Sequence, residues 1–138
     1  MVLRLQAVPR VTREPDVLKA LLGVHVLVVD HDPDARQLLE SVLSYGGAFV
    51  TPAASADEAL MYLGKGPVNV VVAELELPEK DGYWLLKAIG DRARVVALAT
   101  GPADVMDRAL EAGFDAHIRK PVDPWELCRI VGRLARKP

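Results

Sequence analysis

The chain has 138 residues, of which 51% are hydrophobic and 26% charged, and its formal net charge is −2. This length and composition predict one globular domain with a hydrophobic core, while the near-neutral charge, without a sustained basic run, argues against a nucleic-acid-binding surface. The single cysteine, Cys128, excludes an internal disulfide and a cysteine-based zinc site, and no apolar run approaches the ~20 residues that cross a bilayer.

Residues 1–23 differ in character from the rest of the chain. Pro9 and Pro15 interrupt regular structure there, and charges of both signs alternate with single aliphatic residues. We expect a partly flexible N-terminal extension over 1–23, in which residues 16–22 can form a short helix, followed by one domain over 24–138. The extension lacks the unbroken apolar core of a signal peptide, so we expect a cytoplasmic protein.

Strands and helices are predicted to alternate from residue 24 onward. Short apolar runs predict strands, caps such as Asp32 before Pro33 predict helix starts, and glycines such as Gly46 predict helix ends. The predicted strands cover 24–29, 48–52, 68–73, 94–99 and 116–119. The predicted helices cover 33–45, 56–63, 82–89 and 102–112, and a last helix begins after the acidic cap at Asp123.

The strands are short, branched and almost continuously apolar, which is typical of strands buried on both faces of a parallel sheet. Right-handed connections between parallel strands place helices on both faces, so the fold class is α/β with a doubly wound sheet. We expect the helix over 33–45 to bury Leu38, Leu39, Val42 and Leu43. Cys128 lies on an apolar helix face and is expected to be a buried, unreactive thiol.

Polar residues follow the predicted strands where each one ends. Asp30 follows the first strand, Glu74 the third, Thr100 the fourth and Lys120 the fifth. In open α/β sheets the carboxyl ends of the strands share one edge, where ligands bind. Carboxylates, a hydroxyl and a lysine at one edge indicate a phosphoryl-transfer site that uses a divalent metal.

The run from Glu74 through Leu77-Pro78 to Asp81-Gly82, together with Asp30 and Lys120-Pro121, resembles bacterial response-regulator receiver domains. The resemblance covers most of the chain after residue 24. It implies a flavodoxin-like (βα)5 fold with strand order 2-1-3-4-5, and a function in phosphorelay signal transduction by a two-component system. The resemblance also implies that the protein is not an enzyme.

The resemblance also assigns positions to individual residues. Glu74 stands where the family has its phosphoacceptor aspartate, and Asp30 and His31 stand where it has a pair of acids. The remaining assignments are the conserved hydroxyl at Thr100, the conserved lysine at Lys120, whose bond to Pro121 is typically cis, and the switching aromatic at His117. The segment between Thr100 and Gly113 is about two residues shorter than in the family.

Two of these departures affect the expected chemistry. Mg²⁺ prefers hard oxygen ligands, so His31 weakens a magnesium site at Asp30, and its nitrogen shifts the preference toward zinc or other transition metals. Glu74 reaches one methylene further than aspartate, and a nucleophile misplaced by ~1 Å can lose ~10²-fold in rate. Mg²⁺ is therefore a doubtful cofactor, and no other is expected.

We therefore expect an atypical receiver, or pseudo-receiver, that acts through protein–protein interaction. Its expected partner is a histidine kinase or a downstream effector, bound by the helix over 102–112, the strand over 116–119 and the last helix; a homodimer through this face is also expected. Glu74 can hold the domain in a partly active-like state, leave a fixed docking surface, or merely pair with Lys120. The alternatives are a phosphoreceiver that uses Glu74, and a small α/β enzyme or flavin carrier, against which the lack of a glycine-rich phosphate loop counts.

Overall fold

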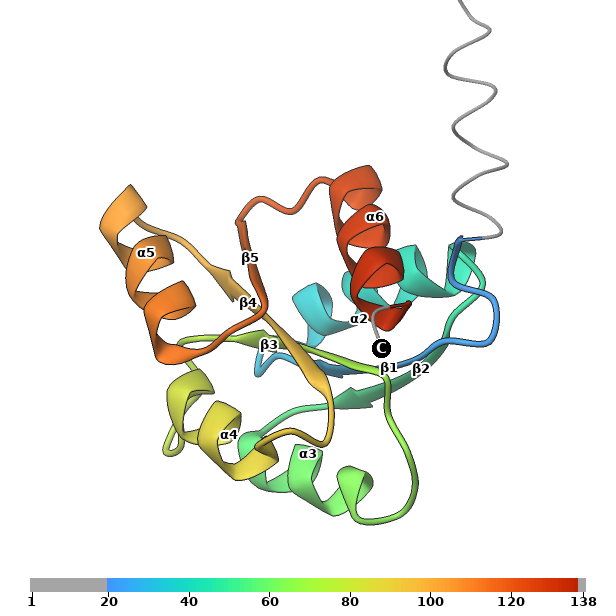
Figure 1. The fold of residues 1–138 in the computed structure, drawn as a ribbon, viewed down its shortest axis with the longest axis horizontal. Coiled ribbons are helices and arrows are strands. Elements are labelled where there is room, and N and C mark those ends of the chain that lie inside the picture. Colours follow the sequence, from blue (N-terminus) through green and yellow to red (C-terminus); the bar gives the residue numbers. More distant parts are fainter. Residues whose placement is uncertain (1–19, 137–138) are drawn as a thin grey trace, which may run out of the picture.

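A computed structural model describes residues 20–136, and its centre is a parallel sheet of five strands (Figure 1). The strands lie in the order β2-β1-β3-β4-β5, which confirms the predicted topology. Their bounds are β1 His25–Val29, β2 Phe49–Ala53, β3 Val70–Glu74, β4 Arg94–Ala99 and β5 Ala116–Arg119. Residues 1–19 of the extension predicted over 1–23, with most of its predicted short helix over 16–22, lie outside the described residues, and the division of the extension from the domain stays a prediction.

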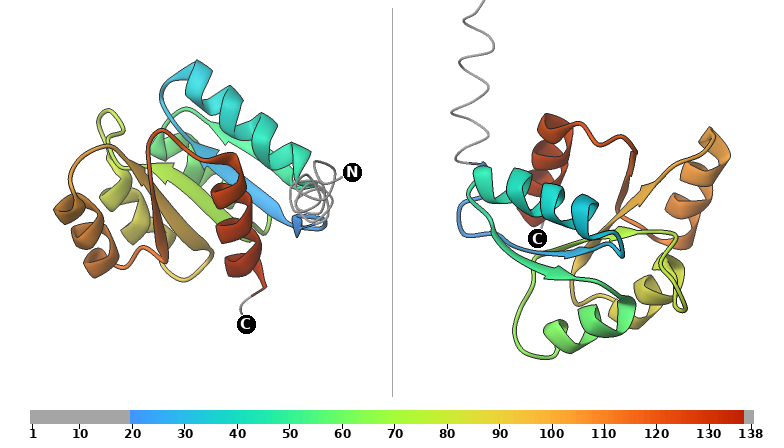
Figure 2. Two further views of the ribbon diagram at one scale, coloured as in Figure 1. Left: turned by 90° about the horizontal axis from the view of Figure 1, so that it is seen from above. Right: turned by 180° about the vertical axis from the view of Figure 1, so that it is seen from behind.

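Within residues 20–136, five helices cover the two faces of the sheet (Figures 1 and 2). Their bounds are α2 Pro33–Tyr45, α3 Ala56–Leu63, α4 Gly82–Ile89, α5 Ala103–Ala112 and α6 Pro124–Ala135. Helices α2 and α6 lie on one face, and α3, α4 and α5 lie on the other. This arrangement follows from the right-handed crossovers that join parallel strands.

Acidic or hydroxyl side chains begin most of these helices, as the sequence predicts. Asp32 accepts a hydrogen bond from the Asp34 amide at the start of α2, and Ser55 accepts one from the Glu58 amide at the start of α3. Such caps satisfy amide groups that have no partner inside the helix. Because they fix where each helix starts, they also fix the short loops that carry the polar residues at the strand ends.

The core consists of two apolar layers, one on each side of the sheet. Leu27, Val29 and Val71 point into one layer, and Val26, Val28 and Val72 point into the other. The prediction that α2 buries Leu38 is wrong, because this side chain is 63% exposed, whereas Leu39 and Leu43 are buried. A helix that covers an open sheet buries one stripe of its surface, and Leu38 lies beside that stripe.

Two further expectations concern residues away from the strand ends. Cys128 is 1% exposed, and burial raises the pKa of its thiol to about 11, which confirms a buried and unreactive cysteine. Within residues 20–136, every helix is too short or too polar to cross a membrane.

Candidate functional site

The polar residues predicted at the strand ends lie at one edge of the sheet. Asp30 follows β1, Glu74 is the last residue of β3, and Lys120 follows β5. Backbone hydrogen bonds continue the sheet through these positions: the Asp30 amide donates to Ala53, and the Lys120 amide donates to Ala99. The backbone of the sheet therefore fixes where these side chains start, and it places them on neighbouring strands.

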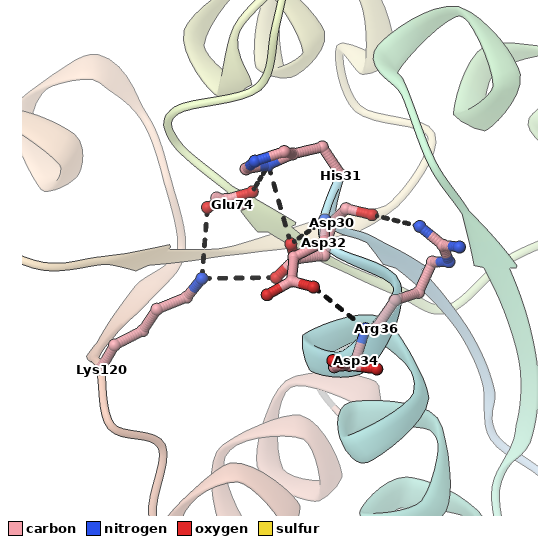
Figure 3. Close-up of polar contacts among 7 residues, drawn as sticks. All are labelled: Asp30, His31, Asp32, Asp34, Arg36, Glu74 and Lys120. Atoms are coloured by element: carbon pink, nitrogen blue, oxygen red, sulfur yellow. Dashed lines mark hydrogen bonds and ion pairs between the residues drawn. The ribbon is translucent and has the colours of Figure 1, made fainter.

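Asp30, His31, Glu74 and Lys120 form one network, which we call the strand-end cluster (Figure 3). The Lys120 ammonium lies 3.3 Å from Asp30 Oδ2 and 3.2 Å from Glu74 Oε1. His31 Nδ1 lies 2.7 Å from the other Glu74 oxygen, Oε2. Both carboxylate oxygens of Glu74 are thus engaged by nitrogen atoms of the protein itself.

Asp30 is the most enclosed member of the cluster. Its side chain is fully buried, and its Oδ1 accepts a hydrogen bond of 3.0 Å from the Asp32 amide. Arg36, which the sequence analysis did not single out, donates to the Asp30 carbonyl at 2.8 Å. The only sequence signal for Arg36 is its place in the first turn of the helix that follows Asp30. Arg36 holds the backbone that presents Asp30 and His31.

Burial and charge shift the pKa values of the cluster in different directions. Burial raises the pKa of Asp30, although the Asp32 amide and Lys120 oppose the shift. Burial also acts to raise the pKa of Glu74, but hydrogen bonds with His31 and Asp30 and the charge of Lys120 outweigh it, so this pKa is lowered. The hydrogen bond with Glu74 raises the pKa of His31 above its ordinary value of 6.5. The Glu74 carboxylate is therefore stabilised as an anion by Lys120 and by its hydrogen bond with His31.

Thr100 and His117 lie outside this cluster. Thr100 follows β4 at the same sheet edge, but its side chain is exposed and makes no hydrogen bond within residues 20–136. His117 is half-buried on β5, and its Nδ1 is buried without a hydrogen-bond partner in the described part of the chain. The fold therefore joins three of the four strand ends through side chains and leaves the end of β4 apart.

Residues 26–132 match the family model described as response regulator receiver domain. The chain belongs to this family. The receiver domain therefore acts in two-component signalling, and the order of its strands agrees with the arrangement that the family resemblance implies. The Lys120–Pro121 peptide bond is cis, as the same resemblance implies.

This receiver domain matches some similar proteins over nearly their whole length and others over about half of it. A protein of Leptolyngbya boryana, named for its 14.6 kDa mass and its place in the sodA1 3' region, is 40% identical over 83% of this chain and 92% of its own. The transcriptional regulatory protein AruR of Pseudomonas aeruginosa is 38% identical over 81% of this chain, which spans about half (49%) of AruR. The Francisella response regulator 1452 receiver domain has a TM-score of 0.77 at 26% identity, over 83% of this chain and 98% of its own.

The donor atoms of the cluster do not fit the divalent magnesium that receiver domains are expected to use. Ligand atoms of Asp30, His31 and Glu74 lie within 4.8 Å of one another. One of the three is an imidazole nitrogen, which Mg²⁺ disfavours as a ligand, and this nitrogen is already hydrogen-bonded to Glu74. The Lys120 ammonium already forms ion pairs with both carboxylates. The oxygens that would hold a metal ion are therefore engaged by side chains of the chain itself.

The loop after Glu74 is held tightly against the end of β3. The Gly82 amide donates to the Leu75 carbonyl at 2.9 Å. A Cβ atom at Gly82 would lie 2.8 Å from the Glu74 carbonyl oxygen and 2.9 Å from the Leu75 Cα, closer than real Cβ atoms approach. Only glycine fits here without a shift of the backbone, so the Asp81-Gly82 pair positions the main chain of the candidate phosphoacceptor site.

Proposed function

We propose that this receiver domain signals through protein–protein contacts and does not undergo conventional aspartyl phosphorylation. Glu74 stands at the phosphoacceptor position, and His31 stands at the second acidic position. We propose equally that the domain has no enzymatic activity of its own. The observation that carries this proposal is the engagement of both Glu74 carboxylate oxygens, by His31 on one side and Lys120 on the other.

Several features of the cluster support a loss of phosphoryl transfer. A carboxylate acts as a nucleophile only when a lone pair faces the phosphorus atom in line with the leaving group. Each Glu74 oxygen instead faces a side-chain nitrogen, of His31 or of Lys120, and the lowered pKa of Glu74 reflects its stabilisation as an anion. The donor set also departs from the oxygen ligands that Mg²⁺ prefers. Both the candidate nucleophile, Glu74, and the candidate metal site, through His31, therefore differ from those of the family.

The geometry favours a fixed docking surface over a domain held in an active-like state. A phosphoryl group carries about −1.5 to −2 charges and three acceptor oxygens, and it can contact a hydroxyl and a lysine together. Glu74 carries one negative charge and contacts Lys120 without reaching Thr100, whose hydroxyl stays exposed. Within the described residues, no contact therefore links the Thr100 hydroxyl at the end of β4 to Glu74 or Lys120.

We propose that the docking surface consists of α5, β5 and α6, and that its partner is a histidine kinase, a downstream effector or a second copy of the chain. His117 lies on β5 at this face, in the position of the switching aromatic. Leu110 of α5, in the same surface, is 44% exposed.

Mass spectrometry of the intact protein after incubation with acetyl phosphate and Mg²⁺ tests the proposal. We expect no stable gain of a phosphoryl group by the natural chain. Glu74→Asp alone should gain little because His31 remains, whereas Glu74→Asp combined with His31→Asp should gain clearly more. Glu76→Asp, at an exposed glutamate two residues further along, is the matched control and should gain nothing.

Three results would contradict the proposal. A stable, Mg²⁺-dependent mass gain in the natural chain that disappears in Glu74→Gln would establish Glu74 as a phosphoacceptor. Normal labelling of Glu74→Asp alone would show that His31 does not impair the metal site. A yellow purified protein with bound flavin would favour the carrier function instead.

A further inference from the structure

An apolar groove lies between α2 and α6, the two helices on the face of the sheet opposite α3 and α4 (Figure 2). Two adjoining cavities form it, and they share Val42 and Pro124 as lining residues. One has a volume of about 300 Å³ and the other about 230 Å³. The side chains that line the groove are mostly apolar, and they include Leu38, Tyr45, Val122 and Trp125.

The α2 wall of this groove exposes large side chains to solvent. Leu38 is 63% exposed and Tyr45 is 53% exposed, although both line the cavities. Residues seven apart share one face of a helix, so the two side chains form a single apolar stripe along α2. Contiguous exposed apolar surface of this kind marks a site that another segment covers.

The described chain enters the domain at the Tyr45 end of the groove. The Leu21 amide donates to the Gly46 carbonyl at 3.0 Å, directly after Tyr45, and the Leu21 side chain is fully buried. The Ala20 carbonyl lies 3.5 Å from the place where a Cβ of Gly132 would be, on α6. The described chain therefore begins beside the two helices that form the groove, and residues 1–19 precede that point in the sequence.

The segment of residues 1–19 has the length and the composition to fill the groove. Its nineteen residues could extend up to ~60 Å, whereas the twelve residues of α6 span ~18 Å. Val17 and Leu18 precede the anchored Leu21 by only a few residues, and further aliphatic residues, among them Val8 and Val11, lie upstream. A short tether gives such a segment a millimolar effective concentration at the groove, which a free partner rarely reaches.

We propose that the segment formed by residues 1–19 binds in the groove between α2 and α6 of the same chain, with Val17 and Leu18 as its anchoring side chains. The segment covers the apolar stripe of Leu38 and Tyr45. Asp30 and Lys120 of the strand-end cluster also line one of the two cavities, but the proposal does not rest on whether Glu74 accepts a phosphoryl group.

Paramagnetic relaxation in NMR tests this binding in the full chain. A nitroxide is attached to Thr12→Cys, because the buried Cys128, with its raised thiol pKa, does not react with the label. We expect the amide signals of Leu38, Ser41 and Tyr45 to lose most of their intensity, while those of Met61 on α3 keep theirs. Adding Val17→Asp and Leu18→Asp should restore the lost intensity, whereas Gln6→Asp, the matched control in the same segment, should not.

A mixture separates binding within one chain from binding between two copies. Isotope-labelled chains without the nitroxide are mixed with unlabelled chains that carry it. We expect the signals of Leu38 and Tyr45 to stay unchanged in this mixture. Loss of intensity in the mixture would assign the groove to a second copy and overturn the proposal. Unchanged intensity in the singly labelled chain would leave the groove to a different protein and overturn it as well.

Discussion

The ends of β1, β3 and β5 differ sharply from the end of β4, although all four lie at one edge of the sheet. At the first three ends, the Lys120 ammonium forms ion pairs with Asp30 and with Glu74. At the fourth, Thr100 is exposed and has no hydrogen-bond partner among residues 20–136. The ion pairs among Asp30, Glu74 and Lys120 are therefore present, whereas the Thr100 hydroxyl, which would contact an added phosphoryl group, makes no contact with them.

The largest expected effect comes from removing the cation of the cluster. Lys120→Met leaves the buried Asp30 carboxyl and Glu74 without their shared ammonium, which should lower the free energy of unfolding by about 3 kcal/mol. Urea unfolding at neutral pH measures it. The matched control is Lys80→Met, which removes an exposed pair with Asp57 and a contact with Trp84 and should cost about 1 kcal/mol or less. If both variants lose the same free energy of unfolding, burial does not make the ion pairs of Lys120 more stabilising than the ion pair of Lys80.

The next effect concerns the backbone at the end of β3. Gly82→Ala places a Cβ against the Glu74 carbonyl and the Leu75 Cα, and the resulting strain should cost about 2 kcal/mol. Gly66→Ala is the control, because a Cβ there meets nothing within 4 Å, and it should change stability by less than about 0.5 kcal/mol. Thermal or urea unfolding of the two variants decides the point. A Gly82→Ala protein as stable as the control would mean that the loop after β3 yields easily.

A third test uses pH to measure the hydrogen bond between His31, which follows β1, and Glu74, the last residue of β3. Because the folded-state pKa of His31 is raised, its stabilisation is complete below the ordinary value of 6.5 and is lost as the pH rises through the folded pKa. The lowered pKa of Glu74 acts in the opposite sense: its contribution is present above 4.5 and is lost as the pH falls through the folded value. NMR titration of the His31 ring should therefore give a lower pKa in Glu74→Gln than in the natural chain.

Glu76→Gln is the matched control for that titration, since Glu76 is exposed two residues further along and should leave the His31 titration in place. An unchanged His31 pKa in Glu74→Gln would rule out the hydrogen bond between His31 and Glu74 in solution.

The smallest effect is expected at the end of β4. Thr100→Ala removes an exposed hydroxyl without a partner among residues 20–136, so the free energy of unfolding should change by less than about 0.5 kcal/mol, and the pKa of His31 should stay the same. Thr51→Ala makes a useful contrast, because that hydroxyl lies 2.8 Å from His25 Nε2, and its loss should cost about 1 kcal/mol. A shift of the His31 titration in Thr100→Ala would connect the end of β4 to the cluster after all.

The fold could be predicted almost completely, because its signals are local in sequence. Short runs of branched residues give the strands, and Asp32, Ser55 and Asp123 begin helices where the caps indicate. Leu38 shows where this reasoning fails. Helical spacing places it near Leu39 and Leu43, but the width of the buried stripe depends on how α2 lies on the sheet, and the sequence does not contain that angle.

The chemical groups at the strand ends can be predicted from the amino-acid sequence, since a strand followed by a polar residue is a pattern within one short segment. Which of those groups contact one another depends on the folded arrangement of the sheet. Lys120 is 90 residues from Asp30 and 46 from Glu74 along the chain, yet one ammonium contacts both, whereas Thr100 at the neighbouring strand contacts neither. The physical reason is that side-chain contacts at a sheet edge depend on strand order, loop path and side-chain length together, and these are set only when the whole sheet is assembled.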